Sequence, residues 1–351
     1  MITRCFWGIL ALSASLCAIE SCEQQQCGYG LPNISTRLPD QCTSFDVFAD
    51  VLLWSAREPA ADCWAEVLSE TTSSVRNDLL EVHFGWDPGF RVGIGYGMNH
   101  DQWDTQVYYT WFHTRGTDSI SSAPGTVHSG FYSNFYVSNP TGGGLSGPAY
   151  SQASIDWTIQ FNIFDWELGR NFWVSRSLAL RPFVGAKGGW IHQSIDSTWK
   201  NPSFIGSQFT NPKFFSTGTE NIKNNFWGIG PSLGINTTWN LYTNACQLFN
   251  LFGDLSGALM WGHWTFHDAF NNDVEQRVTV NLQNINSGAT MIRTFMGLGW
   301  DVYLSQYHFS TKLGYESQFW LDQLQYYSFV GGRLSNALTL QGGTLEFCFD
   351  Y

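Results

Sequence analysis

Apolar and polar side chains alternate with a period of two along most of this chain. The longest alternating segment runs from Phe226 to Leu241, where Trp227, Ile229 and Leu233 share one parity and small or polar residues occupy the other. Period-two alternation is the pattern of a β-strand with two different faces. This segment holds eight residues per face, whereas an ordinary strand has about five or six residues in all. Because a tilted strand needs ~9–11 residues to cross a membrane, the pattern predicts membrane-spanning strands.

The same alternation recurs along the chain and predicts ten strands. We place them at 45–56, 84–98, 102–115, 153–169, 178–199, 225–241, 248–264, 290–304, 307–320 and 338–351. Short turns between them alternate with long polar connections, which fall at 57–83, 116–152, 200–224, 265–289 and 321–337.

Short periplasmic turns and long extracellular loops are typical of outer-membrane barrels. The fold prediction is therefore all-β, an antiparallel transmembrane β-barrel of about ten strands with both ends on the periplasmic side. The stretch 57–83 could hold a further hairpin, which would raise the count to twelve.

Composition favours a barrel over a helical membrane protein. Charged residues make up 13% and aromatic residues 17% of the chain, while the mean hydropathy is only −0.16. Strands that alternate lipid-facing and water-facing residues average to such a value. Outside the first residues there is no apolar run of the ~18 residues that a spanning helix needs. A net charge of −12 without a basic cluster argues against nucleic-acid binding.

The two ends of the sequence indicate export to the outer membrane. Residues 1–21 have the positive start, apolar core and small residues of a signal peptide. We predict a Cys-bearing periplasmic segment at 22–42 and the barrel at 43–351. A lipoprotein acylated at Cys17 or Cys22 is a weaker alternative. The last strand ends on the aromatic Tyr351 and resembles the C-terminal signal of bacterial outer-membrane barrels.

Six cysteines remain after the signal peptide, an even number that permits disulfides in the periplasm. Five lie on the predicted periplasmic side and could cross-link neighbouring chains or a homo-oligomer; the alternative is that some stay reduced. The candidate disulfide cysteines are Cys22, Cys27, Cys42, Cys246 and Cys348.

The polar parity of the predicted strands carries charged side chains. Charges at membrane depth must face water or one another, because exposing Arg or Lys to lipid at mid-depth costs ~2–4 kcal/mol. They would either line a polar channel that biases ion passage or form salt bridges that plug a narrow barrel. The candidate pore-lining residues are Asp46, Asp50, Arg91, Asp104, Asp156, Arg181, Lys187, Asp254, Arg293, Asp301, Lys312, Glu316 and Glu346.

No pattern of catalytic, cofactor-binding or metal-binding residues stands out. There is no Gly-x-Ser-x-Gly elbow. His263 and His267 would sit ~13 Å apart on a strand, too far to share one ion. We therefore predict neither enzyme activity nor a cofactor.

Several strings, in order along the chain, resemble the major outer membrane protein family of Legionella and the Chlamydia-related bacteria. They include Ala49–Glu58, Phe84–Tyr96, Trp166–Ser175, Leu180–Gly185 and Leu340–Leu345. The resemblance implies an abundant outer-membrane porin, through which ions and small hydrophilic solutes diffuse passively. The alternative is a structural or adhesive barrel with a blocked lumen, acting through loops 116–152 and 265–289.

Overall fold

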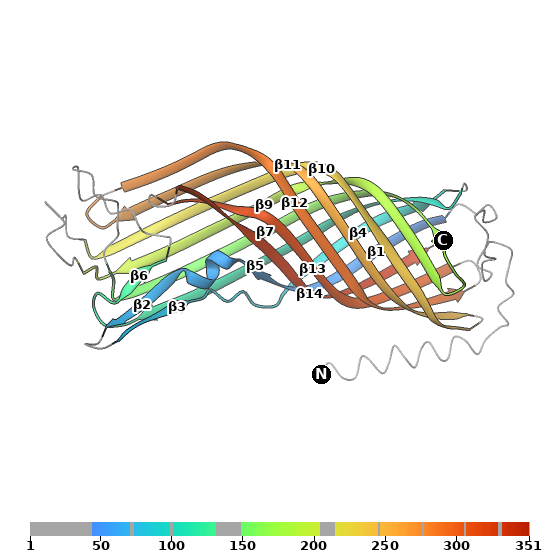
Figure 1. The fold of residues 1–351 in the computed structure, drawn as a ribbon, viewed down its shortest axis with the longest axis horizontal. Helices are drawn as coiled ribbons and strands as arrows, with labels where there is room; N and C mark the ends of the chain where they lie inside the picture. The colour runs from blue at the N-terminus through green and yellow to red at the C-terminus, as the bar shows by residue number, and fades with distance from the viewer. Residues whose placement is uncertain are drawn as a thin grey trace.

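The computed structural model describes residues 44–70, 74–98, 101–130, 149–203, 215–244, 246–275, 277–304, 307–328 and 332–350. These residues form a ten-stranded antiparallel barrel (Figure 1). In chain order its strands are β1 (Ser44–Arg57), β4 (Asp87–Gly97), β5 (Trp103–Ser121), β7 (Gln152–Arg170), β9 (Leu178–Lys200), β10 (Thr217–Thr243), β11 (Gln247–Asn272), β12 (Arg277–Leu304), β13 (Tyr307–Ser328) and β14 (Gly332–Asp350).

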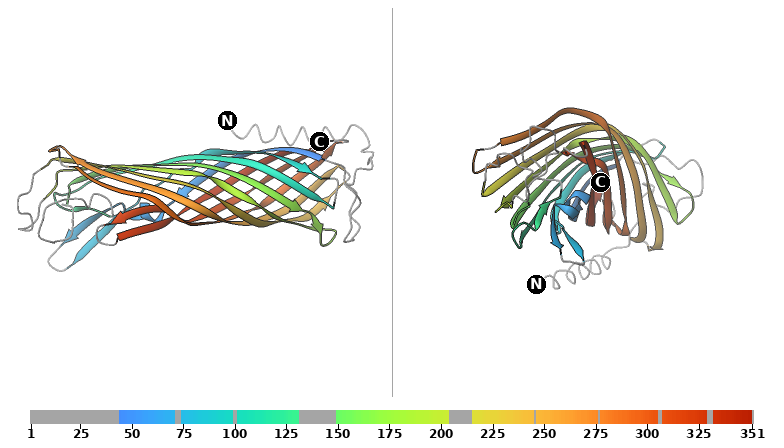
Figure 2. Two further views of the ribbon diagram at one scale, coloured as in Figure 1. Left: turned by 90° about the horizontal axis from the view of Figure 1, so that it is seen from above. Right: turned by 60° about the vertical axis from the view of Figure 1, so that its left-hand side comes forward.

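Each strand pairs with its sequence neighbours in the barrel, and β1 pairs with both β14 and β4, which closes the ring. The two-residue strand β8 (Phe172–Trp173) pairs with β9 in the turn after β7. The start of β1 and the end of β14 lie at the same end of the barrel (Figure 2). Within the described residues, no helix has the length and apolar character to span a membrane.

All ten predicted strands are present, but many run further than predicted toward the loop end. β10, β11 and β12 contain 27, 26 and 28 residues. The predicted long loops at 265–289 and 321–337 are wrong, because β11 and β12 are separated only by 273–276, and β13 and β14 only by 329–331. Residues of both stretches continue the cross-strand pairing of β11 with β12 and of β13 with β14.

The stretch 57–83 does contain a hairpin, but it does not join the barrel wall. It holds a short 3₁₀ helix, η1 (Pro59–Cys63), and the strands β2 (Ala65–Glu70) and β3 (Val75–Leu80). These two strands form a separate sheet of order β3-β2-β6 with β6 (Val127–Ser129). The barrel count is therefore ten and not twelve.

The outer face carries a band of exposed apolar side chains near the turn end. β1 contributes Val51 and Leu53, and β4 contributes Phe90, Val92 and Ile94, all exposed. Every other barrel strand adds residues of the same kind, on the parity that points away from the lumen. An exposed apolar belt of this kind is the lipid-facing surface of a membrane barrel.

The side on which apolar side chains lie changes along each long strand. They face outward near the turn end and inward near the loop end. In the part of β7 nearer the turn end, Phe164 and Trp166 point outward. Nearer the loop end, Trp157 and Ile159 are fully buried inside. The odd-numbered residues of β7 face inward along the whole strand. What differs between its two ends is therefore the medium outside the barrel. The loop-end half of the barrel stands in water, and there the apolar side chains fill the interior as they do in a soluble core.

This reversal corrects the prediction for Asp156. Its side chain faces outward, and it forms an exposed ion pair with Arg115 instead of lining the lumen. The sequence interpretation assigned the odd-numbered apolar residues of 155–163 to lipid and Asp156 to the lumen, but those apolar residues face inward and the even-numbered residues face outward.

Candidate functional site: the barrel interior

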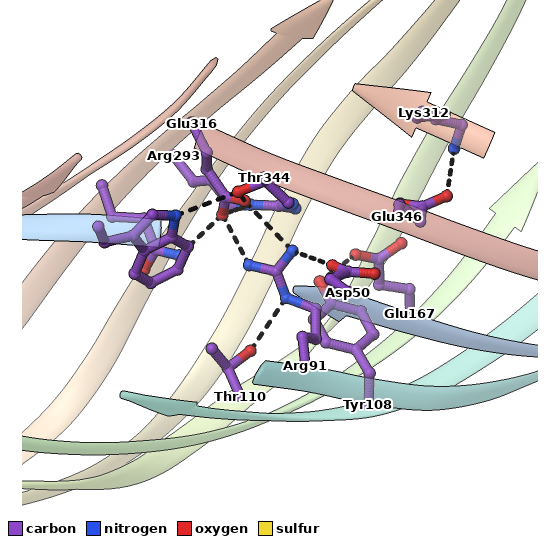
Figure 3. A network of polar contacts seen from close by, with 12 residues as sticks. Asp50, Arg91, Tyr108, Thr110, Glu167, Arg293, Lys312, Glu316, Thr344 and Glu346 are labelled. Atoms are coloured by element: carbon purple, nitrogen blue, oxygen red, sulfur yellow. Dashed lines mark hydrogen bonds and ion pairs between the residues drawn. The ribbon is translucent and has the colours of Figure 1, made fainter. Parts of the chain in front are cut away.

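A network of buried ion pairs crosses the middle of the lumen. Arg91, on β4, lies between two carboxylates from other strands (Figure 3). Its Nη1 donates to Asp50 Oδ2 on β1 at 2.7 Å, and its Nη2 donates to Glu316 Oε1 on β13 at 2.7 Å. Glu316 also accepts from Arg293 Nε on β12 at 2.6 Å. The Arg91 side chain is 3% exposed and both of its carboxylate partners are 0% exposed.

Two neutral hydroxyl groups also take part in the central network. Thr110 Oγ1 accepts from Arg91 Nε at 3.0 Å, and Thr344 Oγ1 donates to Glu316 Oε2 at 3.1 Å. The Thr344 hydroxyl also accepts from the Trp54 indole nitrogen, at 3.1 Å. Hydrogen bonds to the remaining lone pairs are what a buried ion pair needs to offset its desolvation.

Beside this network, Lys187 on β9 pairs with Asp165 on β7. Together with the Arg91 network, this pair makes a group of three cations and three carboxylates, whose charges balance. The space between these groups is too small for a water-sized sphere, and it is bounded by Arg91, Tyr108, Thr110, Phe161, Ile163, Asp165, Lys187, Arg293 and Gln318. We call this set of six charges, Asp50, Arg91, Asp165, Lys187, Arg293 and Glu316, the central ionic layer.

A second, wetter group of charges lies toward the turn end. Arg181 Nε donates to Asp104 Oδ1 at 2.8 Å, and its Nη1 donates to Glu167 Oε2 at 2.9 Å. Lys312 Nζ donates to Glu346 Oε1 at 2.8 Å, and the Lys312 side chain is 33% exposed. The periplasmic half of the lumen is therefore a polar vestibule, formed by paired charges that water reaches in part.

Above the central ionic layer the interior is apolar. Inward side chains from every barrel strand except β4 join one cluster of buried residues, and η1 and the residue after it pack into this cluster with Ala60, Ala61 and Trp64. The Trp64 ring lies 5.7 Å from that of Trp199 on β9. The segment 58–65 therefore fills the extracellular mouth, and we call it the plug.

This part of the interior also buries carboxyls, among them those of Glu58, Glu220 and Asp268. Glu58, at the start of the plug, is 0% exposed, and its Oε1 accepts from Gln193 Nε2 at 2.9 Å. Its Oε2 has no hydrogen-bond partner among the described residues. Burial raises the pKa of Glu58 well above its ordinary value, and the Gln193 hydrogen bond offsets this only in part.

Of the thirteen predicted pore-lining residues, the structure places all but Asp156 on the inward face. Most of them pair with one another; Asp301 accepts instead from Asn250, at 2.6 Å, and Asp254 lies among Lys312, Arg293 and Asn236. The sequence interpretation missed Asp165 and Glu167 because it had assigned their parity to lipid. The available signal was the adjacent Phe164 and Trp166, which occupy the opposite parity.

The structure describes only some of the cysteines that were predicted to form disulfides. Cys348 is a free thiol within the described chain and belongs to the inward face of β14, and its predicted cross-link to a neighbouring chain stays a prediction. Cys246 lies in the turn between β10 and β11, and its predicted pairing is not tested by the described contacts. Cys22, Cys27 and Cys42, like the predicted signal peptide 1–21 and segment 22–42, fall outside the described residues.

Comparison with known proteins decides the family. Residues 37–350 match the family model described as Legionella pneumophila major outer membrane protein precursor. The chain belongs to this family. The predicted membership is confirmed, and this member of the Legionella outer membrane protein family is an outer-membrane β-barrel whose apolar band contacts lipid. No curated protein matches the chain.

Solved structures similar to this family member are distant. A major outer membrane protein from Thermus thermophilus has 9% identity over 89% of this chain and 100% of its own, with a TM-score of 0.33. The outer membrane protease OmpT from Escherichia coli has 12% identity over 92% of this chain and 99% of its own, with a TM-score of 0.41. Ail, the attachment invasion locus protein of Yersinia pestis, has 9% identity over 88% of this chain and 98% of its own, with a TM-score of 0.24. Likeness at this level carries no argument about function.

Proposed function

We propose that this protein is a structural outer-membrane barrel with a closed lumen, which acts through its extracellular end. The observation that carries the proposal is the central ionic layer, in which Arg91 on β4 binds Asp50 on the neighbouring strand β1 and Glu316 on β13, three strands away around the ring, with no room for a water-sized sphere between the charged groups. The geometry supports this alternative better than a permanently open porin.

Passage of an ion through this interior would be costly. The ion would have to separate Arg91 from carboxylates that are fully buried, and leaving one buried charge unpaired costs ~3–5 kcal/mol. It would then meet the plug, where Trp64 is 0% exposed, and the apolar side chains of the wall at that level, such as Trp157 on β7, which is also 0% exposed. An apolar constriction excludes ions by dewetting.

The extracellular sheet offers a surface for contacts with other molecules. β3 is an edge strand, and its residues Val75 and Leu79 are 68% and 60% exposed. An exposed edge with apolar side chains is a template for a partner strand. This supports a structural or adhesive role at the cell surface, with no catalytic step or cofactor. Export would use the predicted signal peptide 1–21.

Recordings from purified, folded protein in planar lipid bilayers test the proposal. We expect no conductance steps from protein whose insertion is verified by protease access to the extracellular sheet. Reproducible steps with a solute size limit from the unmodified chain would refute a closed barrel.

A porin is the second candidate, and the polar vestibule around Arg181 and Lys312 favours it. Ions and small hydrophilic solutes could enter this half from the periplasm, and they would pass if the central ionic layer opened. The same bilayer recording separates the two functions, because a porin predicts steps at low applied voltage.

A further inference from the structure

Three barrel strands repeat one short pattern at the outer edge of the lipid-facing band. The pattern is a tryptophan followed two residues later by a histidine: Trp111 and His113 on β5, Trp190 and His192 on β9, and a third pair on β11. Because residues two apart on a strand share a face, each pair presents both rings on the outside. β5, β9 and β11 all run from the turn end to the loop end, so in each pair the histidine lies further from the membrane.

The third pair, Trp261 and His263, lies beside the others in the sheet. Trp190 is opposite Trp227 on β10, and Trp227 is opposite His263. The Trp227 and His263 rings lie 5.7 Å apart. Trp111 on β5 is opposite Asn162 on β7, which in turn is opposite Trp190. The three pairs therefore lie along neighbouring strands of one surface from β5 to β11, which we call the Trp-His patch.

This patch marks the boundary between acyl chains and water. On its membrane side, the outward residues are apolar, as at Val107 on β5 and Leu259 on β11. On its far side, the outward positions are polar, as at Arg115 and Ser194. Tryptophan is enriched where an amphipathic ring meets lipid headgroups, so the histidines stand at headgroup level.

Two of the histidines are oriented by asparagines on the next strand. His192 Nδ1 lies 2.8 Å from Asn225 Oδ1, and His263 Nδ1 lies 2.9 Å from Asn286 Oδ1. An amide oxygen can only accept, so Nδ1 donates in both pairs. The opposite ring nitrogen, Nε2, is then left for a partner outside the protein, and it donates when the ring is charged.

We propose that the Trp-His patch binds lipids of the outer leaflet through the phosphate of their headgroups. The indole rings would lie at the acyl boundary, and His113, His192 and His263 would contact phosphate oxygens. Arg115, two residues beyond His113, adds a cation whose ion pair with Asp156 is exposed and can open toward a second anion. The proposal concerns the outer surface and holds whether the lumen is closed or conducting.

Competition between two lipids that differ only in phosphate tests this inference. Folded protein in neutral detergent is incubated with equal amounts of dioleoylphosphatidic acid and dioleoylglycerol, and native mass spectrometry counts the lipid retained. Because each cation at a membrane surface contributes on the order of 1 kcal/mol, the unmodified chain should prefer phosphatidic acid at least about ten-fold. The triple variant His113→Gln, His192→Gln and His263→Gln should lose most of this preference.

His267→Gln is the matched control, since His267 is also paired with an asparagine on β12 but lies four residues further along β11. It should keep the full preference. Equal retention of the two lipids by the unmodified chain, an unchanged triple variant, or an equal loss in the control would each overturn the proposal. So would displacement of the lipid by excess inorganic phosphate alone. A heat-dependent shift in electrophoretic mobility checks that each variant is folded.

Discussion

Replacing Glu316 with glutamine should destabilise the barrel more than any other single change of a lumenal acid. Glu316 accepts from Arg91 and from Arg293, at 2.7 and 2.6 Å, and is itself 0% exposed. Glutamine keeps the size of the side chain and one acceptor oxygen. It removes the negative charge that two buried guanidinium groups share.

The expected magnitude follows from the charge count of the central ionic layer. Three cations face three carboxylates in the native layer, so Glu316→Gln leaves a net charge of +1 in a space that excludes water. Removing one partner of a buried ion pair costs ~3–5 kcal/mol. Since two arginines lose the same partner, we expect a loss near the upper end of that range.

The assay is unfolding in urea in detergent micelles. The folded fraction is read from the heat-dependent shift in electrophoretic mobility of the barrel. The companion variant combines Glu316→Gln with Arg293→Gln, which restores charge balance at two cations and two carboxylates. It should recover ~0.5–3 kcal/mol of the loss, the range expected for directly contacting residues.

Two results would refute the reasoning. If Glu316→Gln lowers the free energy of unfolding by less than ~1 kcal/mol, the layer is hydrated and its charges are screened. If the double variant is no more stable than the sum of the single variants predicts, the two side chains do not interact in the folded barrel.

Three further predictions concern the plug and the outer surface. The pKa of Glu58 is raised in the folded state. The contribution of the Glu58 carboxyl to stability is therefore complete below the unfolded pKa of about 4.3 and is lost as pH rises toward the folded pKa. The melting temperature should fall over that pH window, and it should fall less in Glu58→Gln. Trp157→Ala should lower the free energy of unfolding by ~3–5 kcal/mol, measured in urea, because it empties a fully buried site; a loss below ~1 kcal/mol would mean that this half of the lumen is open. Asp156→Asn should change stability by less than ~1 kcal/mol, since its pair with Arg115 is exposed; a loss typical of a buried pair would place it back in the lumen.

The strands could be predicted from sequence because pairing in a barrel depends on a local, period-two pattern. All ten ranges overlap observed strands, including 153–169 within β7 and 178–199 within β9. Their ends toward the cell exterior could not be predicted from composition, since polar residues such as those of 265–289 form a hairpin above the membrane as readily as a loop. The pattern says that two faces differ, and not which medium either face meets.

The charged site was predictable for the same reason and within the same limit. In the half of the barrel near the turn end, a charged residue on the parity opposite to the apolar residues must face inward. This rule places Arg91, Glu316 and Lys187 on the inward face, as the structure does. In the upper half that rule fails, because water lies outside, and Asp156 was misplaced. The plug was not predictable, since nothing in the local pattern of 58–65 says that this loop folds back into the mouth.

The sequence nevertheless carries a signal for the height at which each strand leaves the membrane. At that level the outward residue still meets lipid headgroups while the inward residue already meets the apolar plug, so two neighbouring positions are both apolar. Such doublets are Trp111-Phe112 on β5, Ile163-Phe164 on β7, Trp190-Ile191 on β9 and Phe226-Trp227 on β10. In each, one member is buried and the other faces outward. Apolar doublets also occur near the turn end, at Val47-Phe48 and Leu251-Phe252, so a doublet marks the outer boundary only when apolar residues on the loop side of it occupy the opposite parity. On β7 that condition holds, and reading the facing of charges in opposite senses on the two sides of Ile163-Phe164 assigns Asp156 and Asp165 correctly.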